Sequence, residues 1–323
     1  MLAKHRKLSL IVGLSSAALL TGELAARLVL GLGTPPLSIE HPSIEYMFKP
    51  NQDVSRFGNR ILINEYGMRS ESFPPQRRDS SEIRIMVFGD SVINGGSLTD
   101  HSDLATTLIA KELAQTKNTK AIVGNISAGS WGPGNWLAYA KEYGFFDADA
   151  VVLVLSSHDY ADNPTFKSLN PNTHPTRAPV LALSEAFNRY LIPYSGNLLT
   201  GMTREVFNGS TSEIWSVDAA AIQQVLVNLE EFLLLAQEEG RKVVMILHPT
   251  REEMQNQKMQ EGHYKLSDLA AQLNIPTLRL KDAYQQPLAN GTDIYRDDIH
   301  INDMGQRILA DVLLEVTPWP TNW

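Results

Sequence analysis

The sequence of 323 residues contains no cysteine. This absence excludes disulfide bonds, thiolate metal ligands, a cysteine nucleophile and a lipid-modified cysteine. Basic residues are also scarce, since 28 Lys and Arg stand against 36 Asp and Glu, for a net charge of −8. No long basic run follows the first few residues, so the sequence predicts no binding to nucleic acid.

A Gly-x-Ser-x-Gly motif is missing too, which argues against the common serine-esterase fold that carries its nucleophile in that motif. The chain has no internal repeat and no low-complexity tract. Apolar residues make up 43% of the sequence. This share is typical of a folded globular protein whose core is large enough to hold a pre-organised site.

The beginning of the chain has the pattern of a membrane anchor. Three basic residues precede an uncharged run over 8–22: Lys4, Arg6 and Lys7. Glu23 and Arg27 can pair on a helix, and no small-x-small cleavage site follows the run. Residues 1–35 are therefore predicted to form a single-pass anchor in the cytoplasmic (inner) membrane, with the folded part on the periplasmic side. A cleaved signal peptide is the alternative, and it also places the folded part beyond the membrane.

Two further regions follow the predicted anchor. Residues 36–82 mix short apolar stretches with Gly, Asn and Pro, which predicts an extension of small strands and turns ending in a linker. A domain is predicted over 83–323, with a long loop excursion at about 163–213 that is either a lid or a solvated insertion. Its predicted strands lie at 84–88, 121–126, 150–155, 242–247 and 276–280, and its predicted helices at 103–115, 135–143, 217–239, 264–273 and 301–316.

The predicted strands are apolar on both faces and alternate with helices. This pattern indicates an α/β fold in which about five parallel strands lie between layers of helices. Right-handed crossovers bring the carboxyl ends of all strands to one edge of the sheet, where sites form in open α/β sheets.

Two short motifs carry residue types that catalyse acyl transfer. The first predicted strand runs into Gly89-Asp90-Ser91, which places a serine hydroxyl at the functional edge of the sheet. Near the other end, Asp297 comes three residues before His300. A carboxylate at this spacing can hold one imidazole nitrogen while the other takes a proton from serine. Taken singly, the motifs also fit an N-capping serine and a helix start with acidic residues.

Together these motifs resemble the SGNH/GDSL hydrolase superfamily, over about residues 83–318. The resemblance implies a three-layer α/β/α flavodoxin-like fold and a catalytic triad of Ser91, His300 and Asp297. It assigns the oxyanion donors to the amide of Ser91, to a glycine after the second strand and to a residue after the third. No cofactor and no metal are implied.

The two middle blocks depart from the family pattern. Gly129 is the predicted oxyanion glycine, with Ser130 and Gly132 as alternatives under another register. His158 stands where the family has asparagine, and its ring N–H is the predicted third oxyanion donor. Asp90 is expected to be a local hydrogen-bond acceptor rather than the triad acid.

Four further residues are open to two interpretations. His248, after the fourth strand, either lines the site or is a structural histidine, and the structural role is favoured. Three aromatic residues could form a sugar-stacking platform, although aromatic residues at such spacing are more often part of the core: Trp131, Trp136 and Tyr160.

The leading functional hypothesis is a serine esterase acting on O-acetyl or similar esters of an exported polysaccharide. An O-acetyltransferase or a lipid esterase would use the same triad. A metal-dependent enzyme is a different alternative, with four oxygen and nitrogen ligands: Asp90, Asp297, Asp298 and His300. The departure at His158 also keeps open a non-catalytic binding or assembly subunit of an envelope polysaccharide system.

Overall fold

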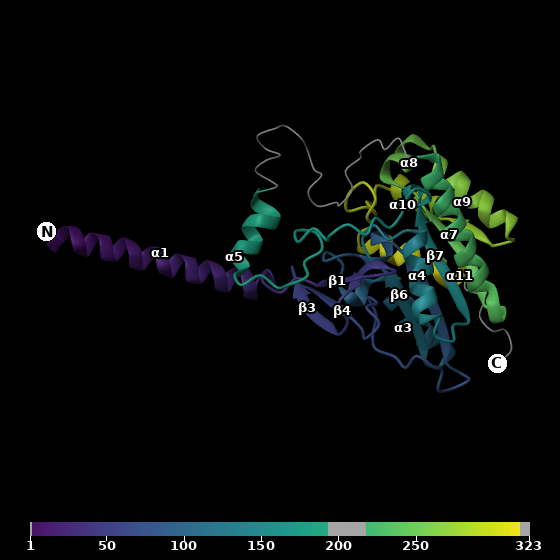
Figure 1. Cartoon of the computed structure of the whole chain (residues 1–323), viewed down its shortest axis with the longest axis horizontal. Helices are drawn as coiled ribbons and strands as arrows, with labels where there is room; N and C mark the ends of the chain where they lie inside the picture. Colours follow the sequence, from purple (N-terminus) through teal and green to yellow (C-terminus); the bar gives the residue numbers. More distant parts are fainter. Residues whose placement is uncertain (1, 193–217, 317–323) are drawn as a thin grey trace.

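The structure, a computed structural model, describes residues 2–192 and 218–316, and a five-stranded parallel sheet forms its centre (Figure 1). The strand order is β6-β5-β7-β8-β9. The bounds are Ile83–Gly89 for β5, Ala121–Ser127 for β6, Ala150–Ser156 for β7, Lys242–His248 for β8 and Thr277–Arg279 for β9. All five predicted strands are confirmed. The last is shorter than predicted because it lies at the sheet edge and pairs over only three residues.

The chain crosses over at strand β5, which lies between β6 and β7. In a sheet of this order, the connection after β5 runs to β6 on one side and the connection after β7 runs to β8 on the other, which opens a crevice at the carboxyl ends of β5 and β7. The residues that follow β5 therefore occupy the position where α/β sheets form their sites.

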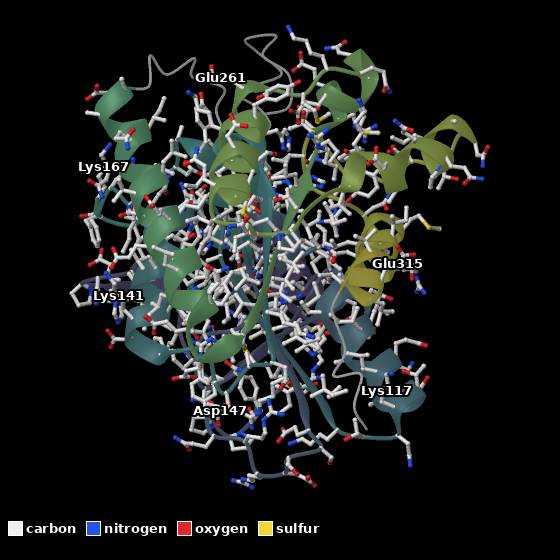
Figure 2. The ribbon with its side chains drawn as sticks, turned by 90° about the vertical axis from the view of Figure 1, so that its right-hand side faces the viewer. Lys117, Lys141, Asp147, Lys167, Glu261 and Glu315 are labelled. Atoms are coloured by element: carbon white, nitrogen blue, oxygen red, sulfur yellow. The ribbon has the colours of Figure 1, made fainter. Side chains whose placement is uncertain are left out.

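Helices cover both faces of the sheet, which confirms the predicted α/β class with three layers. One layer holds α4 (Pro133–Tyr143), α7 (Ala219–Gln237) and α9 (Glu261–Gln272), and the other holds α3 (Ala105–Lys117), α10 (Leu280–Ala289) and α11 (Asp303–Val316). Because side chains alternate along β5, Phe88 packs into the first layer and Val87 into the second. Figure 2 shows Lys141 of α4 and Glu315 of α11 on opposite sides of the sheet.

Short helices complete the domain, and sequence periodicity did not predict most of them. These are α2 (Ser91–Asn94), α8 (Arg251–Asn256), and the 3₁₀ turns η1 (His101–Asp103), η2 (Ser157–Tyr160) and η4 (Glu238–Gly240). Helix α10 was also not predicted, because it contains Pro287, which breaks the helical sequence signal.

The extension before the sheet consists of two antiparallel hairpins. Strand β1 (Ser38–His41) pairs with β2 (Glu45–Phe48), and β3 (Gln52–Arg56) pairs with β4 (Asn59–Ile63). Apolar residues of this extension belong to the same core cluster as Phe88 of the central strand: Ile44, Tyr46, Met47, Met68 and Phe73. The extension thus packs on the sheet domain as part of one core.

Helix α1 (Leu2–Leu28) projects away from the rest of the protein (Figure 1). In the described residues, two helices are long and apolar enough to cross a membrane, over His5–Leu28 and Ala219–Gly240. The second is largely α7, whose buried side chains pack on the sheet, so it is a core helix. The N-terminal helix instead exposes large apolar side chains along its length, among them Leu8, Leu14 and Leu28.

The connection from α1 to the first hairpins is short and hydrogen-bonded. The amide of Phe57 donates to the carbonyl of Leu30 (3.0 Å), and the Arg56 guanidinium donates to the carbonyl of Gly31 (3.0 Å). Gly31 has a φ of +66°, and a Cβ there would overlap the carbonyl of Ser55. Only glycine therefore allows this close approach of the two chain segments.

The predicted loop excursion at 163–213 is irregular only in part. Residues 161–181 have no regular helix, but α5 (Ala182–Glu185) and the π-helical turn η3 (Ala186–Leu191) follow. Residues 193–213 of that prediction lie outside the described residues. Local sequence did not reveal α5 because its cap comes from a distant helix, where the Glu23 carboxylate accepts from the amides of Ala182 (2.8 Å) and Leu183 (3.0 Å).

Candidate active site

Ser91 lies directly after the central strand, at the carboxyl edge of the sheet. It begins the short helix α2, and the Asp90 carboxylate caps this helix by accepting from the amide of Val92 (2.8 Å). A Cβ at Gly89 would clash with Ile93 and with the carbonyl of Val154, so this tight turn requires glycine. The turn leaves the Ser91 side chain half-buried at the edge of the sheet.

Asp297 and His300 belong to a small loop closed by an isolated antiparallel bridge between Tyr295 and Ile301. The Asp297 carboxylate accepts from the backbone amides of Ile299 (3.0 Å) and His300 (2.8 Å). These bonds arise from the local spacing of the motif. They hold the carboxylate in position for its hydrogen bond with the imidazole of His300.

The structure brings Ser91, His300 and Asp297 together in a continuous hydrogen-bonded chain. The Ser91 Oγ lies 2.7 Å from the His300 Nε2, across 209 residues of sequence. The His300 Nδ1 lies 2.9 Å from the Asp297 Oδ2 and 3.0 Å from its Oδ1. Because the carboxylate accepts the Nδ1 proton, the Nε2 is free to accept the proton of the serine hydroxyl.

Electrostatics keep the Asp297 carboxyl ionised. Its partial burial raises the pKa, but the hydrogen bond and the charge of His300, together with the two amide donors, outweigh burial and lower the pKa to about 2. An ionised carboxylate beside Nδ1 stabilises the imidazolium that forms when His300 takes a proton.

Two arginines that the motifs did not reveal hold the Asp297–His300 loop. Arg251 donates to the carbonyls of Asp297 (3.0 Å) and Tyr295 (3.0 Å). Arg296 donates to the Thr99 hydroxyl (2.6 Å) and to the Gly95 carbonyl (3.3 Å). Gly95 ends the helix that starts with Ser91. Arg296 therefore connects the Asp297–His300 loop to the segment that carries Ser91.

His248 is a structural histidine, as the sequence favoured. It is fully buried, and burial lowers its pKa to about 4, so the ring is neutral at physiological pH. Its Nε2 lies 2.8 Å from the carbonyl of Ile299, and its Nδ1 lies 3.4 Å from the Tyr284 hydroxyl. Since a carbonyl only accepts, Nε2 carries the proton and holds the residue next to His300.

His158 lies in a cluster of carboxylates next to Ser91. Its Nε2 is 3.4 Å from the Asp90 Oδ2 and 3.7 Å from carboxylate oxygens of both Asp159 and Asp162. Burial lowers the pKa of His158, but the three carboxylates outweigh it and raise the pKa to about 10. The Nε2 proton therefore faces carboxylates, and the role of His158 as an oxyanion donor stays a prediction.

The cluster around His158 contains a possible set of metal ligands. Among the described residues, the atoms of Asp90, His158 and Asp159 lie close enough together to share an ion. The ligand set predicted from sequence was different, because it combined Asp90 with Asp298 and the two triad residues. An imidazolium repels a cation, so we interpret the cluster as an ion-pair network.

The loop after β6 holds the candidate oxyanion amides. The amide of Gly132 donates to the side chain of Asn135 (3.0 Å), so it is already used, whereas Gly129 and Ser130 remain as donors. The Tyr46 hydroxyl donates to the carbonyl of Gly129. Tyr46 comes from the extension, and no local pattern in the sequence connected it with this loop.

The proposed stacking platform does not form from the two tryptophans. Trp131 and Trp136 are only 2% and 0% exposed. The indole of Trp131 donates to the carbonyl of Tyr46, and that of Trp136 donates to the carbonyl of Gly89, at 3.0 Å each. Both rings therefore belong to the core, while Tyr160 is half-buried.

No protein-family model matches the sequence, and no curated protein matches it. Solved structures do resemble it. A member of the lipolytic protein G-D-S-L family from Veillonella parvula DSM 2008 has 14% sequence identity and a TM-score of 0.43, with 73% of this chain and 98% of that chain covered. The acetyl xylan esterase AlAXEase has 14% identity and a TM-score of 0.45, with 73% and 100% covered.

A lipase/acylhydrolase from Enterococcus faecalis has 16% identity and a TM-score of 0.42, with 72% of this chain and 94% of that chain covered. At such identities and TM-scores, the likeness carries no information about the substrate of this chain. The chain is similar to solved structures described as GDSL-family lipolytic enzymes and esterases, the family that its motifs at Ser91 and His300 resemble.

Proposed function

We propose that the protein is a serine esterase of the SGNH type, with Ser91 as nucleophile, His300 as general base and Asp297 as the group that orients the base. One observation carries this proposal. The Ser91 Oγ, the two His300 nitrogens and the Asp297 carboxylate form one chain of hydrogen bonds of 2.7–3.0 Å at the edge of the sheet.

The mechanism follows from the positions of these atoms. The Ser91 Oγ attacks the ester carbonyl carbon while its proton passes to the His300 Nε2. The backbone amides of Ser91 and Gly129 are the proposed donors to the negative oxygen, with His158 as a further cationic group nearby. The tetrahedral intermediate then expels the alcohol, which takes the proton from His300, and leaves an acyl-Ser91.

Deacylation repeats these steps with water as the nucleophile. His300 removes a proton from water, the hydroxide adds to the acyl carbon, and the Ser91 Oγ leaves with the proton that His300 returns. A sugar hydroxyl in place of water would make the same residues an O-acetyltransferase. The choice between the two depends on which acceptor reaches the acyl-Ser91.

The surroundings of Ser91 favour a short acyl group on a polar alcohol. His158 and Asp162 are 43% and 36% exposed and form the accessible part of the charged cluster that includes Asp90, the neighbour of the serine. A long lipid acyl chain needs an apolar channel, whereas this polar wall suits a hydroxylated substrate. The proposed substrates are therefore O-acetyl or similar esters of a polysaccharide that is exported across the membrane.

The apolar helix α1 is proposed to hold the enzyme at the cytoplasmic membrane, with the sheet domain on the outer side. Its apolar side chains are exposed along its length, and basic residues precede the apolar run. Positive residues stay on the cytoplasmic side of a membrane, which sets this orientation.

Labelling of the full-length protein with a fluorophosphonate tests the proposed triad, because such a probe reacts with an activated serine whatever the substrate is. We expect the wild type to label, and Ser91→Ala and His300→Ala to remain unlabelled. Asp297→Asn should label roughly 10³–10⁴ times more slowly, because the imidazole loses its orienting partner.

Ser97→Ala is the matched control, since Ser97 lies on the loop that follows α2 but outside the hydrogen-bonded chain. It should label like the wild type. A folded wild type that fails to label would overturn the esterase proposal and favour the non-catalytic binding subunit. If labelling succeeds, acetyl-ester hydrolysis with and without added sugar acceptors distinguishes a hydrolase from a transferase.

A further inference from the structure

The segment of α5 and η3 exposes large apolar side chains that the active site does not use. Four of them lie between residues 180 and 191, with exposed fractions of 89, 52, 56 and 57%: Val180, Leu181, Phe187 and Leu191. Single exposed apolar residues are common on soluble proteins, but a contiguous group of this size marks an interaction surface.

The opposite face of this segment is fixed to the protein by buried polar contacts. Glu185 forms an ion pair with Arg56 at 2.6 Å, and both side chains are 1% exposed. The amide of Gly33 also donates to the Glu185 carboxylate (2.6 Å). The segment thus turns Glu185 and a small apolar group around Ala182 toward the protein, and it still exposes large apolar side chains outward.

The same segment is tied to α1. The Glu23 carboxylate accepts from the first amides of α5, and the Arg27 guanidinium donates to the carbonyl of Val180 (2.7 Å) and to Glu23 (2.7 Å). In Figure 1, α5 starts at the end of α1 and runs across its direction rather than along it. A helix placed in this way lies along the membrane plane when α1 crosses the bilayer.

The length of α1 sets the depth of this junction. The uncharged run over residues 8–22 is only about 22 Å long at 1.5 Å per residue, short of the hydrocarbon core of about 30 Å. A span that continues to Leu28 is about 31 Å long and fits. Leu24, Leu28 and Val29 are 56, 81 and 71% exposed, so they form an apolar surface beyond Gly22.

A span that ends near Leu28 places Glu23 and Arg27 at the edge of the bilayer. Both side chains form hydrogen bonds with each other and with residues 180–183, which lowers the cost of polar groups at that depth. The apolar face at 180–191 then lies at the same level and is continuous with the apolar surface of α1.

We propose that α5, η3 and the preceding Val180 and Leu181 form an interfacial element that inserts its apolar face into the outer leaflet, between the lipid headgroups and the acyl chains. In this proposal, the apolar face contacts the lipid bilayer and not another protein. The inference rests on the proposed membrane anchoring of α1, and it adds a second, monotopic contact to that anchor.

The absence of cysteine allows a direct test with the full chain in vesicles of phosphatidylcholine and phosphatidylglycerol. Single-cysteine variants Phe187→Cys and Leu191→Cys carry an environment-sensitive NBD label. Leu14→Cys reports the middle of α1, and Lys117→Cys reports the end of α3 on the domain (Figure 2). Each label is quenched with lipids bearing a shallow or a deep nitroxide and with aqueous iodide.

We expect the labels at 187 and 191 to lose fluorescence with the shallow nitroxide and to resist iodide. The label at 14 should respond to the deep nitroxide, and the label at 117 to iodide only. Quenching of 187 and 191 by iodide while 14 responds to the deep nitroxide would overturn the interfacial proposal and leave the anchor intact.

Two other outcomes also contradict the interfacial proposal. Labels at 187 and 191 that resist both quenchers would show a protein partner, such as a second copy, on this face. A label at 14 that ignores the lipid quenchers would remove the anchor and the interfacial element together. Fluorophosphonate labelling of the same variants reports the triad separately, so failure of the esterase proposal stays distinguishable.

Discussion

Two histidines beside the proposed triad differ in charge because their neighbours differ. His248 is surrounded by aromatic rings and a carbonyl, and burial lowers its pKa to about 4. His158 lies 3.4 Å from the Asp90 carboxylate, and three carboxylates raise its pKa to about 10. At pH 7 the His248 ring is therefore neutral and donates to the Ile299 carbonyl. The His158 ring is a cation that neutralises part of the charge of the nearby carboxylates.

The charge of His158 predicts a pH dependence of stability. A pKa raised from 6.5 to about 10 means that the folded protein binds a proton that the unfolded chain releases between these values. The contribution is complete below pH 6.5 and disappears as the pH rises through about 10. We expect the melting temperature of the wild type to fall more steeply than that of His158→Asn over this window.

Melting curves of both proteins from pH 6 to pH 10 check this expectation, with His41→Asn in the first hairpin as the control. The control should follow the wild type throughout. Parallel curves for the wild type and His158→Asn would mean that His158 titrates near its ordinary value, and the ion-pair interpretation of the cluster would fail.

Prediction of single site residues from the sequence was possible where these residues are closely spaced in the chain. The Asp297–His300 spacing and the turn at Ser91 are local, so the sequence was sufficient to propose them. Arg251 and Tyr46 reach the site from other parts of the chain, and Arg296, although next to Asp297, contacts Gly95 and Thr99 far away in sequence. Such contacts depend on the tertiary fold and leave no local sequence pattern.

At the level of elements, the hairpin of β1 and β2 is a support of the site. Glu45 has a φ of +79°, a strained value for this residue type, and its carboxylate accepts from the amides of Thr165 (2.8 Å) and Phe166 (3.0 Å). The next residue, Tyr46, donates to Gly129. One hairpin thus contacts both the loop after β6, which holds the candidate oxyanion amides, and the segment that follows η2.

Removal of the Tyr46 hydroxyl should therefore affect turnover. Tyr46→Phe leaves the carbonyl of Gly129 without its donor, which costs about 1–2 kcal/mol, or roughly a 5- to 30-fold loss of kcat/KM. Hydrolysis of a chromogenic acetyl ester gives the rate. Tyr143→Phe is the control, because that hydroxyl makes a long contact of 3.7 Å with the Met47 sulfur. Equal rates for the two variants would show that Tyr46 does not position the oxyanion loop.

The sequence predicted the sheet strands and the long helices well, because their apolar patterns are set by burial within each element. It missed α5 and α10 for physical reasons that differ. Helix α5 is capped by Glu23 across 159 residues, and α10 contains a proline that packing tolerates. Elements that depend on distant partners leave a weak signal in their own residues.

At the scale of the whole molecule, the extension and the sheet share one apolar core. Met47, in the extension, is 1% exposed and lies in the cluster that contains Phe88 of the central strand. The predicted boundary at residue 83 thus separates segments of sequence that are packed together, and we propose that they unfold as one cooperative unit.

Met47→Ala tests this cooperativity. The truncation should destabilise the protein by about 2–5 kcal/mol and shift the urea midpoints of tryptophan fluorescence and of far-ultraviolet circular dichroism by the same amount. Tryptophan fluorescence follows the extension because the Trp131 indole is bonded to Tyr46. Lys49→Ala, at an exposed position, should shift neither midpoint. A fluorescence transition that separates from the dichroism transition would show that the extension unfolds alone.

The bonded connection between α1 and the hairpins has a consequence for the position of Ser91. Leu30 and Gly31 are joined to β3 and its turn by direct hydrogen bonds, with no free tether between helix and domain. With α1 in a bilayer, Ser91 therefore stays at a constant height and a constant tilt above the lipid surface. For the proposed esterase, this fixed geometry would mean that the polysaccharide has to move past Ser91.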